Sequence, residues 1–315
     1  MKGKTSQSYL YGAAILTAGT VAVKILGLLY KLPAANLLGD VGYSDFTVAY
    51  YIYAVLLTVS TAGLPVALSK MISEAGGGRA VKTVFSVAWF TFFCLGAAGT
   101  AVMALFPVQL AAVMGNAGAA PAIRALAPSV LLVCLLSAYR GYEQGHSNMR
   151  LTARTQILEA AVRLAVGLPL ASLCLYRGQG LPAAAAGAIT GVTASSAAAL
   201  LYAVFGKRRM DRLRGAADGG REGAPAEVFR RLVRISVPIA LGSSVMSVID
   251  LVDSALLLNR MQGTLGYARE LAAALHGVYS KAQTVFNVPA AFAVPVAVSV
   301  IPAISRGLAA RRPRE

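Results

Sequence analysis

The feature that most constrains the fold is a series of long apolar segments separated by short basic ones. The chain is 57% hydrophobic and only 13% charged, whereas soluble domains carry about 25% charged residues. About 20 apolar residues in a helix cross the hydrocarbon core of a bilayer. No period-two alternation is present, and lipid offers no partner for unpaired backbone groups. The sequence therefore predicts an all-α membrane protein.

Eight segments are long enough and apolar enough to cross a bilayer as helices. Their ranges are 9–32, 46–68, 81–106, 122–139, 153–176, 181–205, 233–258 and 271–304. The first is longer than the apolar region of a cleaved signal peptide, which spans about 7–15 residues. We therefore expect it to remain as a transmembrane helix.

The distribution of lysine and arginine predicts the orientation. If the N-terminus is cytoplasmic, the segments on that side contain 21 of the 29 Lys and Arg residues, and the opposite side contains five. Basic residues accumulate on the cytoplasmic side of membrane proteins, so we expect both termini to be cytoplasmic. The net charge of +16 does not indicate a nucleic-acid partner, because the basic residues lie between spans rather than on one soluble face.

A short internal similarity suggests two related lobes. The segments PVALS (65–69) and PVAVS (295–299) lie at the end of the second span and within the eighth. If they correspond, spans seven and eight repeat spans one and two, and the repeat unit contains six helices. An even number of helices gives both copies the same orientation, which is a parallel repeat. Chance similarity in an apolar background is the alternative.

This repeat divides the chain into four predicted regions. Residues 1–206 form a six-helix lobe, 207–232 a basic cytoplasmic linker, 233–305 the first two helices of a second lobe, and 306–315 a basic tail. Because four helices of the second lobe are then missing, we expect the chain to be a truncated or split form of a longer one. A chain that supplies those helices is an expected partner.

Four blocks of sequence carry a resemblance to a known family. They begin with KILGLLYKLPAANLLGD in 24–74, YRGYEQGHSNM in 139–164, RISVPIALGSSVMSV in 234–261 and KAQTVFNVPAAFAVPV in 281–305. In this order they resemble the stage V sporulation protein B group of polysaccharide exporters. That group belongs to the superfamily of the lipid II flippases and the multidrug and toxin extrusion transporters.

The resemblance implies a function as well as a fold. It implies a flippase in the cytoplasmic membrane of a bacterium, with two lobes that alternate access to a site between them. The implied substrate is an undecaprenyl-pyrophosphate-linked oligosaccharide or peptidoglycan precursor, used in cell-wall, spore-cortex or polysaccharide synthesis. Membrane lipids and cell-wall synthases are the corresponding expected partners. The last four core helices of the family are absent from this sequence.

Ionisable residues inside the predicted spans are candidates for function, because they are costly in lipid. They are Lys24, Glu159, Arg163, Asp250, Asp253 and Lys281. A lysine is a suitable point charge for phosphate, so Lys24 and Lys281 are predicted to hold the pyrophosphate across the lobe interface. Asp250 and Asp253 are predicted to neutralise them or to bind a coupling proton or Na⁺.

The resemblance refines the cationic candidates in the first helix. Flippases of the superfamily use cationic side chains of that helix as substrate contacts. Lys24 matches the first such position, Lys31 at the outer end is a weaker match, and Tyr30 occupies a later position where the family has a cation. We include Tyr50 and Tyr53 as residues that stack on sugar rings, with helix packing as the alternative.

The remaining candidates concern helix pairing and movement. Glu159 and Arg163 are four residues apart, which favours an ion pair along one helix, although a charge-balancing role is the alternative. Gly63, Pro65 and Pro295 are the predicted hinges, because proline and glycine interrupt helices. Arg140, Gln144 and Asn148 are predicted to lie in a cytoplasmic loop that closes an inner gate or simply carries positive charge.

Other classes of function fit the sequence less well. A cation-coupled multidrug exporter would not need lysines for phosphate, and a scaffold without transport activity is a further alternative. An enzyme is not expected, because His146 and His276 are predicted on opposite sides of the membrane. No cysteine or carboxylate spacing indicates a metal site. We expect no cofactor other than a coupling ion.

Overall fold

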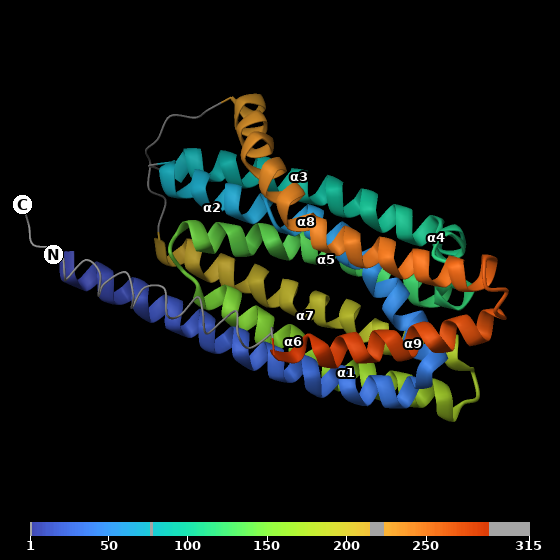
Figure 1. The fold of residues 1–315 in the computed structure, drawn as a ribbon. Helices are drawn as coiled ribbons and strands as arrows, with labels where there is room; N and C mark the ends of the chain where they lie inside the picture. Colours follow the sequence, from blue (N-terminus) through green and yellow to red (C-terminus); the bar gives the residue numbers. More distant parts are fainter. Residues whose placement is uncertain (1, 76–77, 215–223, 290–315) are drawn as a thin grey trace, which may run out of the picture.

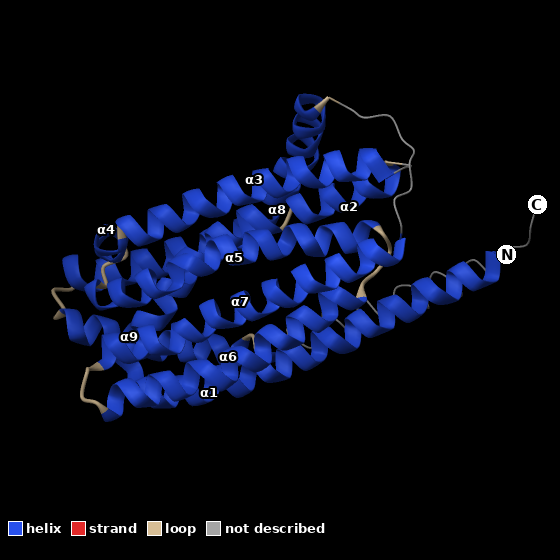
Figure 2. Cartoon of the chain, turned by 180° about the vertical axis from the view of Figure 1, so that it is seen from behind, coloured by secondary structure: helices blue, strands red, loops and turns tan. Residues whose placement is uncertain are grey.

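The computed structural model describes residues 2–75, 78–214 and 224–289, and this part of the chain is a bundle of long helices without strands (Figures 1 and 2). The predicted all-α class is confirmed. The described elements are α1 (Lys2–Thr61), α2 (Leu64–Glu74), α3 (Gly78–Leu105), α4 (Pro107–Val113), η1 (Ala117–Ala119), α5 (Ala120–Gly145), α6 (Arg150–Tyr176), α7 (Leu181–Arg214), α8 (Pro225–Gly263) and α9 (Arg269–Phe286).

The first two predicted spans form one kinked element, α1. Its helical geometry is interrupted at Gly39, which has φ 65° and ψ −165°. This positive φ is the left-handed region that glycine adopts without steric cost, and α1 reverses direction at this point (Figure 1). The predicted spans 9–32 and 46–68 imply a non-helical connection between residues 32 and 46, and this prediction is wrong. The residues that flank Gly39 are helical, and one glycine is sufficient to turn the chain.

The connections gather at two ends of the bundle. We call the end with Gly39, the α4–α5 connection, the α6–α7 turn and the α8–α9 turn the kink end. We call the end with the α2–α3 and α5–α6 turns and the start of α8 the linker end. Figure 1 shows the kink end on the right and the linker end on the left. Alternate connections thus lie at opposite ends, as a multi-pass membrane protein requires.

Among the described residues, six helical stretches have the length and apolar composition of a membrane span. The first, Ala22–Glu74, contains residues 22–32 of the first predicted span and the whole of the second, and the other five coincide with predicted spans three to seven. The predicted eighth span begins in α9, and its remainder, with Pro295 and the basic tail, lies outside the described residues. Within the predicted linker, 207–232, residues 207–214 continue α7 and residues 225–232 begin α8. Residues 215–223 lie outside the described part of the chain.

The first lobe and α8 approach closely at the linker end. Gly63 lies in the two-residue break between α1 and α2, and Pro65 is in the first turn of α2. A Cβ atom at Gly63 would lie 2.0 Å from the backbone oxygen of Ser236 in α8. Only glycine allows the two backbones to meet at this distance, so the chain break is also a packing point. The hinge role of Gly63 and Pro65 stays a prediction.

Replacement of Gly63 by alanine is expected to destabilise the fold. The added methyl group must displace backbone atoms of α8, and such overpacking costs about 1–3 kcal/mol. Thermal unfolding in detergent should show a lower midpoint for Gly63→Ala. The matched control is Gly27→Ala, because a Cβ at Gly27 has no neighbour within 4 Å. An equal effect of both substitutions would contradict the close crossing.

Candidate functional site

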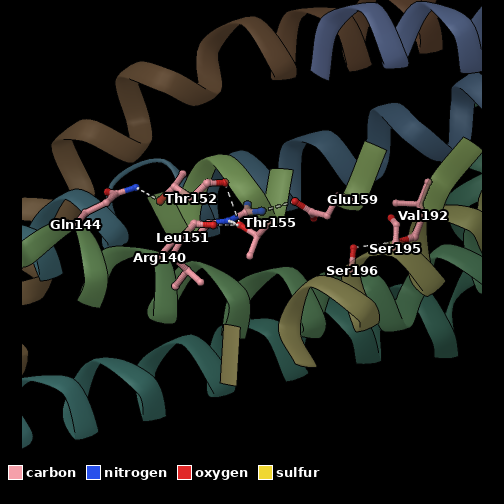
Figure 3. A network of polar contacts seen from close by, with 9 residues as sticks. All are labelled: Arg140, Gln144, Leu151, Thr152, Thr155, Glu159, Val192, Ser195 and Ser196. Carbon is pink, nitrogen blue, oxygen red and sulfur yellow. Dashed lines mark hydrogen bonds and ion pairs between the residues drawn. The ribbon is translucent and has the colours of Figure 1, made fainter. Parts of the chain in front are cut away.

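A network of polar side chains joins α5 to α6 near the linker end (Figure 3). The Arg140 guanidinium donates to Thr155 Oγ1 (2.9 Å) and forms an ion pair with Glu159. One turn further along α5, Gln144 Nε2 donates to Thr152 Oγ1 (3.0 Å). The side chains of Arg140 and Glu159 are only 14% and 13% exposed. The ion pair is therefore largely shielded from water and holds two spans together.

This network corrects two predictions. Arg140 and Gln144 are not in a loop, because α5 continues to Gly145 and carries both side chains toward α6. Only Asn148 lies in the turn, where its Nδ2 donates to Glu143 Oε2 (2.7 Å). The expected ion pair of Glu159 along its own helix is also wrong, because Arg140 of the neighbouring helix takes that position. A gating role for these residues stays a prediction.

Arg163, one turn beyond Glu159, faces three tyrosines of α1. Its side chain is a hydrogen-bonding neighbour of Tyr50, and Tyr30 and Tyr53 lie within electrostatic range. Within the described residues, Nε of Arg163 is buried and has no hydrogen-bond partner. Lys31 approaches the same tyrosine, with Nζ 5.8 Å from the centre of the Tyr50 ring. We refer to Lys31, Tyr50, Tyr53 and Arg163 as the cation–tyrosine site.

The kink of α1 assembles this site. Lys31 lies on the arm before Gly39 and Tyr50 on the arm after it, and the reversal at Gly39 brings the two residues together. Aromatic rings fill the space between the arms: the Tyr30 and Phe46 ring centroids are 6.2 Å apart, and those of Tyr50 and Tyr53 are 5.8 Å apart. Two cations and an aromatic face thus meet inside the first lobe.

The predicted lysine pair is not brought together. Lys281 forms an ion pair with Asp40 at the kink, with Nζ 2.7 Å from Oδ1. Lys24 is exposed and lies about 22 Å along α1 from that point, at 1.5 Å per residue. Lys281 is thus neutralised by a residue that the sequence placed in a connecting segment. Asp250 and Asp253 of α8, the predicted partners of Lys281, form no ion pair with it.

The two aspartates of α8 have different surroundings. Asp253 is exposed and accepts a hydrogen bond of 2.8 Å from the Tyr279 hydroxyl of α9. Asp250 is half-buried and forms no ion pair with any described residue. Charge balance between Lys281 and this aspartate pair is therefore not observed. Ion binding by Asp250 or Asp253 stays a prediction.

A buried polar network at the kink end was not expected from the sequence. His276 of α9 is fully buried between Ser44 of α1 and Ser254 of α8, with Nδ1 and Nε2 at 2.8 and 2.7 Å from the two hydroxyls. Asn116 Nδ2 donates to Ser44 Oγ (3.1 Å). Three helices, α1, α8 and α9, and the connection between α4 and η1 therefore meet through side-chain hydrogen bonds. His146 bonds to Tyr142 at the linker end, so the two histidines do lie apart.

Loss of Arg140 is expected to destabilise the bundle strongly. Arg140→Ala would leave the Glu159 carboxylate buried without its partner, which costs about 3–5 kcal/mol. The double variant Arg140→Ala with Glu159→Gln removes the uncompensated charge and should recover most of the loss in thermal unfolding.

An exposed ion pair provides the control. Arg231 and Glu74 are 53% and 41% exposed, and such pairs contribute about 0–1 kcal/mol. Arg231→Ala should therefore change the unfolding midpoint little. A similar loss for Arg140→Ala and Arg231→Ala would contradict a buried structural role for Arg140.

Comparison with known proteins places this fold and these sites in a family. The family described as polysaccharide biosynthesis protein matches residues 9–308. The chain belongs to this family. It is similar to the stage V sporulation protein B of Bacillus subtilis (strain 168), with 25% identity over 315 aligned positions that cover 96% of this chain and 59% of that protein.

Two further similarities define the superfamily. The lipid II flippase MurJ of Bacillus subtilis (strain 168) is 30% identical over 175 positions, which cover 50% of this chain and 31% of the flippase. The crystal structure of a MATE protein in complex with MaD3S has a TM-score of 0.63 at 15% identity, and covers 93% of this chain and 64% of that chain. The described bundle therefore has the fold of these transporters.

The chain spans between half and six tenths of the length of the curated relatives that it matches over nearly its full extent. Family and fold together identify a multi-pass membrane protein of the superfamily that contains the flippases and the multidrug and toxin extrusion transporters. The printed function among these relatives is that of a flippase, which is transport rather than enzymatic catalysis. The predicted family and superfamily are confirmed.

Proposed function

We propose that the chain transports an undecaprenyl-pyrophosphate-linked oligosaccharide or peptidoglycan precursor across the cytoplasmic membrane of a bacterium. The observation that supports this most is the convergence of Lys31 and Arg163 on Tyr50 inside the first lobe. Ammonium and guanidinium groups form strong, charge-assisted hydrogen bonds to phosphate. An aromatic face beside them offers a surface for an attached sugar ring.

The charges of the other buried cations strengthen this proposal. Arg140 is neutralised by Glu159, and Lys281 by Asp40. Lys31 and Arg163 form no ion pair with a described residue and both lie beside Tyr50, while Glu159, one turn away on α6, interacts with Arg163 only at longer range. A cation without a paired anion is costly inside a membrane protein, and an anionic ligand would remove that cost. The cation–tyrosine site is therefore suited to a pyrophosphate rather than to a cationic drug.

The orientation and the transport cycle belong to the same proposal. The linker end is cytoplasmic, because it carries most of the Lys and Arg residues, and the kink end faces outward. Both termini are then cytoplasmic. The substrate enters the first lobe from the linker end and leaves when α8 and α9 separate from α1. Membrane lipids, cell-wall synthases and a chain or segment that completes the second lobe are the proposed partners.

A cation-coupled multidrug exporter and a scaffold without transport activity are the alternative functions. The half-buried Asp250 without an ion pair suits a cation-coupled multidrug exporter, since such a protein uses carboxylates toward its cargo or coupling ion. Lys24 is exposed and free to meet a lipid headgroup at the membrane surface. A scaffold role without transport predicts no substrate binding at all.

Removal of either cation of the site is expected to weaken substrate binding. Each hydrogen bond to a charged group contributes about 1.5–3 kcal/mol, or about 10- to 100-fold in affinity. Lys31→Ala and Arg163→Ala should lower the affinity of the chain in nanodiscs for an undecaprenyl-pyrophosphate-linked sugar by this factor. Flipping of a fluorescent form in proteoliposomes should fall accordingly.

Lys82→Ala is the matched control, because Lys82 is an exposed cation at the linker end of α3. It should bind the lipid-linked sugar as the unmodified chain does. Inorganic pyrophosphate should compete with the substrate in both proteins. Unchanged affinity in Lys31→Ala and Arg163→Ala, or tighter binding of a cationic dye than of the lipid-linked sugar, would contradict the proposed substrate.

A further inference from the structure

One buried carboxylate is absent from every ion pair and hydrogen bond described above. Asp45 of α1 is 1% exposed, and both of its carboxylate oxygens are buried without a hydrogen bond of normal geometry among the described residues, although the Asn116 amide lies beside them. Gly118 of η1 packs directly against it, since a Cβ atom at Gly118 would lie 2.6 Å from Asp45 Oδ1. The carboxyl group is therefore enclosed by protein.

The surrounding elements offer no cation to this group. On α1 and α9, Asp40 and Lys281 neutralise each other, Tyr43 is bonded to Thr284, and His276 is held between two serines. Arg124 of α5 and Arg260 of α8 are exposed. An ionised carboxylate without a partner is very costly in a medium of low dielectric, and such a group takes up a proton instead.

The same place is where the first lobe contacts α8 and α9. Ser44, the residue before Asp45, is bonded both to Asn116 and to His276, and His276 continues to Ser254. A Cβ atom at Gly277 would lie 1.9 Å from the backbone oxygen of Asp40, so α9 crosses the kink at backbone distance. Movement of α9 away from α1 would break these contacts beside Asp45 and loosen the packing that keeps water from its carboxyl group.

We propose that Asp45 is a proton-binding site whose occupancy is linked to closure of the kink end. The carboxyl group holds a proton while the contacts of α9 with the neighbouring Ser44 and Asp40 are made, and it ionises when α8 and α9 separate from α1. The assignment differs from the aspartates of α8, which lie in more open surroundings. The link to a transport cycle rests on the proposed function, whereas proton binding itself does not.

The test is infrared spectroscopy of the full chain in nanodiscs. A protonated carboxylic acid has a carbonyl stretching band that the carboxylate lacks, and the band shifts in D₂O. We expect this band in the unmodified chain at mildly acidic pH and its loss as the pH is raised. Asp45→Asn should lack the band, and Glu270→Gln, which removes an exposed carboxylate at the same end, should keep it.

A second variant tests the link to closure. His276→Ala removes the contact between Ser44 and Ser254 and should let water reach Asp45 more easily, so the band should disappear at lower pH than in the unmodified chain. This measurement keeps the carboxyl group in place and does not depend on the folding of Asp45→Asn. An identical pH dependence in both proteins would overturn the link to closure.

Two results would overturn proton binding. Absence of the band at mildly acidic pH, with no effect of sodium, would make Asp45 a fixed anion of α1 beside η1. A higher unfolding temperature in NaCl than in choline chloride, lost in Asp45→Asn, would identify sodium as the ligand. Neither experiment involves the lipid-linked sugar, so failure here is distinct from failure of Lys31→Ala and Arg163→Ala to lower substrate binding.

Discussion

The left-handed backbone of Gly39 is the constraint on which the rest of the structure depends. It reverses the direction of the 60-residue α1, so that the residues on the two sides of the turn face one another (Figure 1). Lys31 meets Tyr50 across the turn, Asp40 at the turn meets Lys281, and Ser44 just beyond it meets His276. One residue without a Cβ thus positions the interior of the first lobe and its contact with α9.

The pairing of charged side chains inside the apolar bundle determines which helices are joined and which buried groups are left for a ligand. Arg140 finds Glu159 on the next helix, and the pair joins α5 to α6. Arg163 and Asp45 form no ion pair with a described residue, and the Nε atom of Arg163 and both carboxylate oxygens of Asp45 are buried without a hydrogen-bond partner. Because isolated charges are costly in lipid, Arg163 is suited to bind an anionic substrate and Asp45 to bind a proton.

Much of the fold was predictable from the sequence, and the pairing of charges was not. Composition and length located the spans, because the bilayer fixes both, and the basic segments gathered at one end as expected. The turn at Gly39 escaped prediction because Asp40 and its neighbours read as a polar connection. That error also hid Ser44 and Asp45, and helix spacing alone paired Glu159 with Arg163 instead of with Arg140.

The most direct measurement of the central claim is the distance between the substrate phosphorus and the guanidinium nitrogens of Arg163. Solid-state NMR on ¹⁵N-arginine-labelled chain with a bound undecaprenyl-pyrophosphate-linked sugar provides it. The account predicts direct phosphorus–nitrogen contact at Arg163 that is lost in Arg163→Ala and reduced in Lys31→Ala. Contact at Arg140 or at exposed arginines only, with none at Arg163, would contradict the cation–tyrosine site as the place where the substrate binds.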